Sequence, residues 1–136
     1  MQRLLLLTFI FALLNSHSAW GGDKEYHCKI KSIFDLSDDG NLKLSDNNRL
    51  LTTFLVDKTS GLMKGGWLGN EVWPIKTIID SGGSKQAFKL LTLSADVWGT
   101  NGGKNASYLY VMEYADSTEK PFMYTSGFKV VTGVCT

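Results

Sequence analysis

Two cysteines at opposite ends of the chain constrain its fold more than any other feature. Cys28 and Cys135 are the only cysteines among the 136 residues. In an exported protein, an even number of cysteines favours a disulfide bond. The Cα atoms of bridged cysteines lie about 4.4–6.8 Å apart. We therefore predict a Cys28–Cys135 disulfide and a fold whose first and last strands are neighbours.

The N-terminus has the pattern of a secretory signal peptide. Arg3 is followed by the apolar run Leu4–Leu14 and then by the small residues Ser16, Ser18, Ala19 and Gly21. Charge, apolar run and small-residue cleavage site occur in that order in signal peptides. The run is shorter than the roughly 20 residues that span a bilayer. We expect residues 1–21 to be removed, leaving a secreted or periplasmic domain of residues 22–136 that is not inserted into a membrane.

The mature part is typical of a chain of short strands separated by turns rich in glycine, asparagine and aspartate. Tyr26, Cys28 and Ile30 alternate with polar residues, so they are expected on one face of the first strand. Pro74 places its own strand at a sheet edge or a bulge. The expected strands cover residues 26–31, 42–44, 50–56, 72–79, 85–95, 107–114, 122–124 and 128–134, of which 85–95 also tolerates a helix. Such spacing predicts a single all-β domain, an antiparallel small barrel or a sandwich.

Glycine-flanked tryptophans are the candidate ligand-binding residues. Trp67 follows Gly65-Gly66, and Trp98 precedes Gly99. A glycine-rich loop can present a large ring, and aromatic rings give much contact area for little rotamer entropy. Trp73 is followed by Pro74 inside an apolar strand, so we expect it to be packed. The alternative for all three is burial in the core or at a barrel end.

Metal and catalytic signatures are weak. Residues 35–46 copy part of a calcium loop, with Asp35, Ser37, Asp39 and Asp46 as oxygen donors, but the preceding segment is strand-like, which favours an ordinary β-turn. His27 is the single histidine of the mature part, too few for a zinc site. Asp96 and Glu113 are carboxylates that a hydrolase can use as acid and base, although nothing in the sequence places them together. We expect no enzyme, no metal and no cofactor.

The charge balance argues against nucleic-acid binding. Without Arg3, thirteen basic residues face thirteen acidic ones, and Arg49 is the one mature arginine. Nucleic-acid binders carry a basic surplus that this chain lacks. Asn105-Ala106-Ser107 is a glycosylation sequon, relevant only in a host that glycosylates exported proteins.

The Tyr26-His27-Cys28 opening and the Gly133-Val134-Cys135 ending resemble those of small exported bacterial β-proteins, among them periplasmic lysozyme inhibitors with barrel folds. The resemblance covers these two ends and transfers no site residue. Together the observations favour an exported binding module for a protein or carbohydrate ligand. The alternatives are an inhibitor or structural protein that occludes an extracellular enzyme and, third, a carboxylate-dependent hydrolase.

Overall fold

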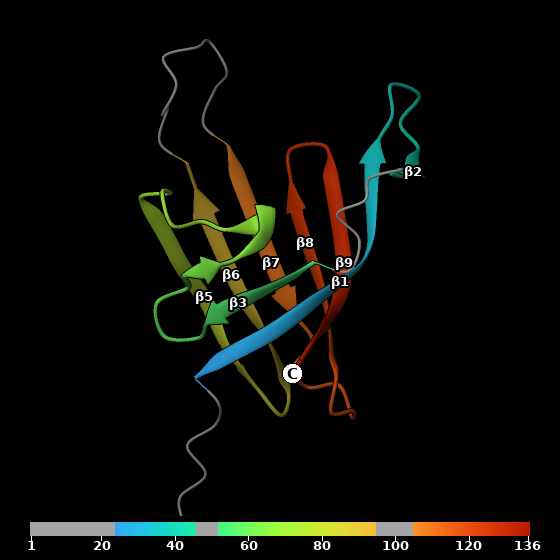
Figure 1. Cartoon of the computed structure of the whole chain (residues 1–136). Helices are drawn as coiled ribbons and strands as arrows, with labels where there is room; N and C mark the ends of the chain where they lie inside the picture. The colour runs from blue at the N-terminus through green and yellow to red at the C-terminus, as the bar shows by residue number, and fades with distance from the viewer. Residues whose placement is uncertain (1–23, 46–51, 95–104) are drawn as a thin grey trace, which may run out of the picture.

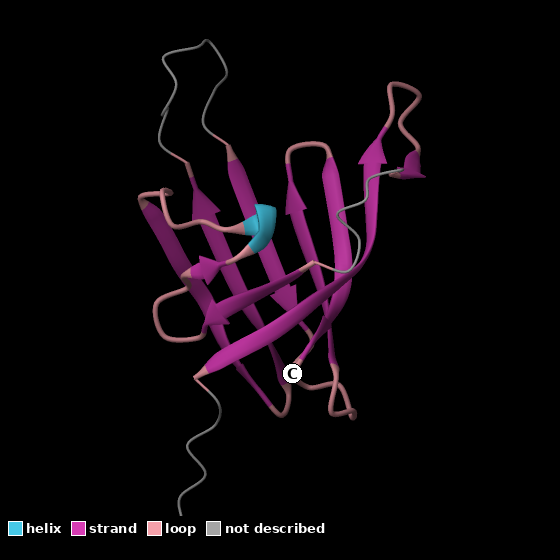
Figure 2. Ribbon diagram, in the orientation of Figure 1, coloured by secondary structure: helices cyan, strands magenta, loops and turns pink. Residues whose placement is uncertain are grey.

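Alternating apolar side chains build one antiparallel sheet that curls into a half-barrel (Figure 1). The computed structural model describes residues 24–45, 52–94 and 105–136. Within them, nine strands follow one another with one short 3₁₀ turn (Figure 2). These elements are β1 (Glu25–Leu36), β2 (Leu42–Leu44), β3 (Thr53–Asp57), β4 (Met63–Lys64), η1 (Gly66–Leu68), β5 (Ile75–Gly83), β6 (Gln86–Leu93), β7 (Ala106–Val111), β8 (Lys120–Ser126) and β9 (Lys129–Cys135). The sheet order is β4-β3-β1-β9-β8-β7-β6-β5, with β2 paired to the end of β1.

The first and last strands are joined as predicted. β1 and β9 pair antiparallel, Cys28 lies opposite Cys135, and the two form a disulfide. Gly133 of β9 makes this approach possible, because a Cβ there would overlap the Lys29 carbonyl oxygen and the Phe122 ring. The predicted all-β class is therefore confirmed. Of the two predicted architectures, the single curled sheet is closer to a barrel than to a two-sheet sandwich.

The core lies inside the curl of the sheet. Tyr26 of β1 meets Phe88 of β6 edge to face, with ring centroids 5.4 Å apart, and Phe54 of β3 meets Phe122 of β8 at the same distance. These pairs connect strands that are not neighbours in the sheet. The alternation expected for residues 26–31 is confirmed, since Tyr26, Cys28 and Ile30 are all buried.

The half-barrel is closed by a side chain rather than by a strand ladder. The buried Asn70 accepts a hydrogen bond from the Met63 amide at 2.7 Å and donates to the Gly61 carbonyl at 3.0 Å and to Thr92 Oγ1 at 3.3 Å. Thr92 belongs to β6, so Asn70 ties the β4 segment to the far side of the sheet. Close packing adds to this bridge, because an added Cβ at Gly61 would lie 2.5 Å from Leu90 Cδ1.

Several sequence-based strand limits differ from the structure, since β1 continues to Leu36, β3 starts at Thr53, β7 ends at Val111 and β8 starts at Lys120. β5 begins at Ile75, after Pro74, and continues through Gly82 to Gly83 with a bulge after Ile78, so it is the edge strand that Pro74 indicated. The ambiguous segment 85–95 forms strand β6. The predicted signal peptide, Asp46, Asp96 and Trp98 lie outside the described residues. Within the described part of the chain, no helix is long and apolar enough to cross a membrane.

Candidate functional site

An aromatic-lined cavity opens at the end of the half-barrel where β8 turns into β9. Its volume is about 330 Å³, at the lower end of the range typical of ligand pockets. Four aromatic side chains line it together with polar side chains at its edge: Trp67, Trp73, Tyr124 and Phe128, then Asn105, Ser126 and Lys129. Figure 1 shows the β8–β9 turn at this end of the sheet, with the η1 segment crossing in front of β7. We call this cavity the aromatic mouth.

Trp67 enters the mouth from η1. Gly65 and Gly66 precede it with φ angles of 88° and 59°, which only glycine adopts readily. These glycines let the chain leave β4 and turn at once into η1. Trp67 is half-buried, and its ring packs against the core while it also lines the mouth. The predicted glycine-presented tryptophan thus has one side on the core and another on the cavity.

Trp73 lies beside the same cavity instead of being packed within a strand. It is half-buried, and its amide donates to the Asn70 carbonyl at 3.0 Å. Lys76 Nζ donates to the Trp73 carbonyl. Because β5 starts only at Ile75, Trp73 escapes the strand alternation from which we expected burial. Its backbone is held on both sides, so the ring is presented from a fixed point.

Phe128 projects from the tip of a tight hairpin. Ser126 pairs with Lys129, which leaves Gly127 and Phe128 as the connecting residues, and Gly127 has a φ of 56°. Glycine with positive φ in the first central position is typical of a type II′ turn. The Phe128 carbonyl also accepts a hydrogen bond from the Leu36 amide at 2.8 Å. The side chain is 59% exposed although its backbone is fixed.

The polar residues of the mouth are one lysine in an ion pair, Lys129, and two neutral side chains, Asn105 and Ser126. Lys129 pairs with Asp35, and its Nζ lies 4.9 Å from the centroid of the Phe128 ring. Hydrogen bonds from Lys129 and Ser45 hold the pKa of the Asp35 carboxyl below its usual value, so the pair stays ionised at neutral pH. The Asn105 backbone amide donates to Ser94 Oγ at 2.9 Å, whereas among the described residues no side chain bonds to the Asn105 side-chain carboxamide or to the Ser126 hydroxyl.

The segment that resembles a calcium loop forms a tight turn between β1 and β2. Asp39 is bonded to Ser37, to the Asn41 amide at 3.2 Å and to Lys43 at 3.3 Å. These partners, Ser37 first, lower the pKa of Asp39 to about 2. Asp35, the first expected donor, is paired with Lys129. In the part of the chain that the structure describes, no three acidic, histidine or cysteine side chains gather closely enough to hold a metal ion.

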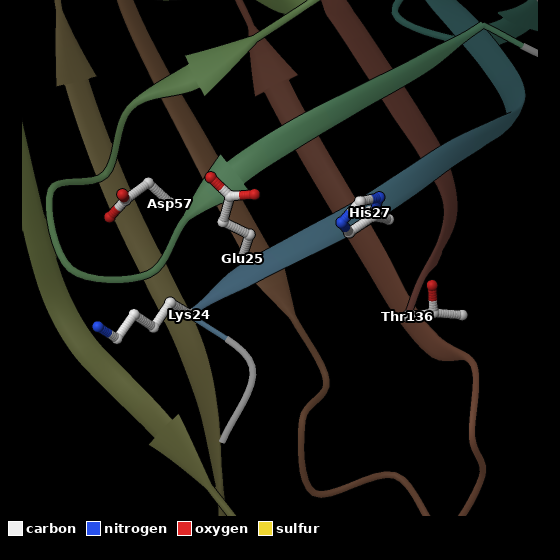
Figure 3. Close-up of a pocket in the computed structure, with 5 residues that line it drawn as sticks. All are labelled: Lys24, Glu25, His27, Asp57 and Thr136. Atoms are coloured by element: carbon white, nitrogen blue, oxygen red, sulfur yellow. The ribbon is translucent and has the colours of Figure 1, made fainter. Parts of the chain in front are cut away.

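A second, polar hollow of about 560 Å³ lies at the opposite end of the sheet, on the outer side of β1 (Figure 3). Lys24, Glu25, His27, Asp57 and Thr136 line it. The Asp57 carboxylate is occupied by the amides of Thr59 and Ser60, at 2.8 and 2.7 Å, which lower its pKa. His27 joins Thr136 through backbone hydrogen bonds. These residues close a turn and pair strand ends, which are structural roles.

A half-buried ion pair lies at the same end of the sheet as the polar hollow. Lys58 pairs with Glu113, and its Nζ lies 4.6 Å from the centroid of the Tyr26 ring. Burial raises the pKa of the Tyr26 phenol, and the neighbouring Glu113 carboxylate adds to the rise. An added Cβ at Gly82 would overlap the Glu113 carboxylate, so glycine is needed there. Glu113, one of the two acids considered for catalysis, is thus committed to Lys58.

No protein-family model, curated protein or solved structure matches the chain. The site therefore stands on its own geometry. Of the two predicted ligand-binding tryptophans, Trp67 lines the mouth and Trp98 lies outside the described residues. Sequence reasoning missed Trp73, Tyr124, Phe128 and Lys129 as cavity residues. The Ser126-Gly127 pair between two apolar runs was the available signal, because it marks a hairpin whose tip carries an exposed phenylalanine.

Proposed function

We propose that this protein is an exported binding module whose ligand enters the aromatic mouth. The observation that carries the proposal is the convergence of Trp67, Trp73, Tyr124 and Phe128, from separate parts of the chain, on one cavity. A concave site lined by aromatic rings with a few polar groups at its edge is the usual form of a ligand pocket.

The mouth is also preorganised. Trp67 rests on the core, Trp73 is anchored through Asn70, and Phe128 stands on a two-residue turn. Fixed rings lose little conformational entropy when a ligand binds. This distinguishes the mouth from the polar hollow of Figure 3, whose Asp57 carboxylate already serves the protein's own turn.

A ligand screen on the mature chain tests the proposal, with tryptophan fluorescence and thermal shift as the readouts. A hit should lose at least about tenfold in affinity, roughly 1.4 kcal/mol, in Trp73→Ala and in Phe128→Ala. Ile79→Ala is the matched control, because Ile79 is 56% exposed and does not line the mouth. Hits that bind both variants as tightly as the parent would refute the mouth as the site.

The β1–β2 arm favours a second candidate, the occlusion of a partner protein. Leu36, Leu42 and Leu44 are 50%, 54% and 62% exposed. Register places Leu36 opposite Leu42 and Phe34 opposite Leu44, so all four belong to one face of the arm, at the upper right in Figure 1. An exposed apolar face of this kind is typical of protein contacts. A partner captured by the parent and by Phe128→Ala, but lost with Leu42→Lys, would support this function instead.

A further inference from the structure

We infer that the aromatic mouth takes a neutral saccharide, entering as the end of a glycan chain. This inference rests on the proposed function and names the ligand class of the same cavity. It follows from the kinds of surface that the mouth presents, from its charge, and from its size and openness.

The walls and the edge of the mouth match the two kinds of surface on a sugar ring. A pyranose has flat patches of C–H bonds on its faces and hydroxyl groups around its rim. The rings of Trp67, Trp73 and Phe128 offer apolar faces to the first kind. The Asn105 side-chain carboxamide and the Ser126 hydroxyl offer donors and acceptors to the second. A purely apolar ligand would leave these two polar groups without partners.

The charge of the mouth excludes an anion as the preferred ligand. Among the residues that the structure describes, Lys129 is the one ammonium group that lines the mouth, and Asp35 already neutralises that charge. An anionic ligand would have to compete with the Asp35 carboxylate for Lys129. A neutral polyhydroxylated ligand can instead leave the pair intact and accept a hydrogen bond from another N–H group of the Lys129 ammonium, which has three donors.

Size and openness indicate one end of a longer molecule. A cavity of about 330 Å³ has room for a monosaccharide or a disaccharide. Phe128 remains 59% exposed at its rim, so further rings can continue outward past the β8–β9 turn. A flat heteroaromatic compound is the main alternative ligand for the aromatic lining, but it forms fewer hydrogen bonds with the Asn105 carboxamide and the Ser126 hydroxyl than a sugar does.

The experiment is a titration of the mature protein with neutral oligosaccharides, cellotriose, maltotriose and diacetylchitobiose, alongside a glycan array. Tryptophan fluorescence should change saturably with one of these sugars. Affinity should fall at least about tenfold in Trp73→Ala and in Phe128→Ala, and stay unchanged in Ile79→Ala. Because the ligand is uncharged, the dissociation constant should remain the same between about 0.1 M and about 1 M salt.

The remaining outcomes separate the inference from the proposed function. Binding of indole or another heteroaromatic probe at the mouth, without any sugar on the array, would overturn the saccharide inference and leave the binding module intact. Binding of acidic glycans that weakens steeply with salt would overturn the neutral class. If neither sugars nor aromatic probes bind, or if they bind Trp73→Ala and Phe128→Ala with unchanged affinity, both the inference and the mouth as a binding site are wrong.

Discussion

The two ends of the half-barrel use their side chains in opposite ways. At the end where the chain enters β1, which we call the entry end, polar and charged groups bond to one another: Lys58 pairs with Glu113, and Asp57 accepts from the amides of its own turn. The Cys28–Cys135 disulfide lies at the same end. At the mouth, the rings of Trp67 and Trp73 are still half-exposed, the Trp73 backbone is held by a hydrogen bond, and no described side chain bonds to the Asn105 carboxamide. If the mouth binds a ligand as proposed, stability and recognition are separated along the same strands, so variants at the two ends should have different effects.

The largest expected effect is the loss of the disulfide. Its cysteines are 107 residues apart, and the loss of such a cross-link from a small exported domain destabilises it by about 2–5 kcal/mol. Urea unfolding of the double variant Cys28→Ala, Cys135→Ala measures this change in free energy. A midpoint equal to that of the parent would mean that the β1–β9 ladder alone holds the entry end.

The second-largest effect on stability is expected at Asn70, which bonds to the β4 segment, to Thr92 of β6 and to the Trp73 backbone. Asn70→Ala leaves the Met63 amide and the Gly61 carbonyl buried without this partner, and each such group is worth about 1–3 kcal/mol. We expect a loss of about 3 kcal/mol in the free energy of unfolding. Glu71→Ala is the matched control at an exposed neighbouring position. A small loss for Asn70→Ala would contradict side-chain closure of the half-barrel.

The Lys58–Glu113 pair should have an intermediate effect. Its side chains are 23% and 18% exposed, and Glu113→Gln should destabilise the fold by about 1–2 kcal/mol. The exposed pair Lys31–Glu119, at 54% and 57%, provides the control, since Glu119→Gln should change stability by no more than about 0.5 kcal/mol. Equal effects from the two substitutions would mean that burial at the entry end adds nothing.

The Asp35–Lys129 pair gives the mouth a small dependence on pH. The folded state lowers the pKa of Asp35, so its contribution is present above the unfolded value, near 4, and is lost as the pH falls through the lower folded value. The melting temperatures of the parent and of Asp35→Asn should differ at pH 7 and converge in acid, once the pH lies below the folded pKa of Asp35. A difference that persists in acid would point to packing rather than charge.

The smallest effect on stability belongs to the ring at the rim of the mouth. Phe128 is 59% exposed, so Phe128→Ala should change the free energy of unfolding by only about 0.5 kcal/mol while weakening ligand binding at least about tenfold. Thermal unfolding and ligand titration on the same sample compare the two quantities. A large stability loss without a binding defect would place Phe128 among the structural residues.

The elements that sequence predicted well are those whose pattern is local. Alternation from Tyr26 to Ile30 needed only neighbouring residues, and the disulfide prediction needed only the expectation of export and an even count of cysteines. β4 and η1 escaped notice because neither contains the apolar–polar–apolar alternation that marks the equally short β2, Leu42–Leu44. Asn70 gave no signal, since its partners Gly61 and Thr92 lie in other segments.

The mouth was predictable only in part for the same reason. The glycines before Trp67 pointed to a presented ring, and that ring does line the cavity. The expected strand start at Val72 hid Trp73, since the strand begins three residues later. Phe128 and Lys129 meet the tryptophans only through the curl of the sheet, which juxtaposes segments about 60 residues apart in sequence and leaves no local pattern.

The most direct test of the separation between the two ends is a nuclear magnetic resonance titration of the ¹⁵N-labelled mature protein with the best-binding neutral sugar. We predict chemical-shift changes at the indole N–H groups of Trp67 and Trp73, at the Asn105 side-chain carboxamide and along Ser126–Lys129. The backbone signals of His27, Asp57 and Glu113 should not shift. Shifts confined to the residues of Figure 3, or to Leu36, Leu42 and Leu44 on the β1–β2 arm, would contradict the account.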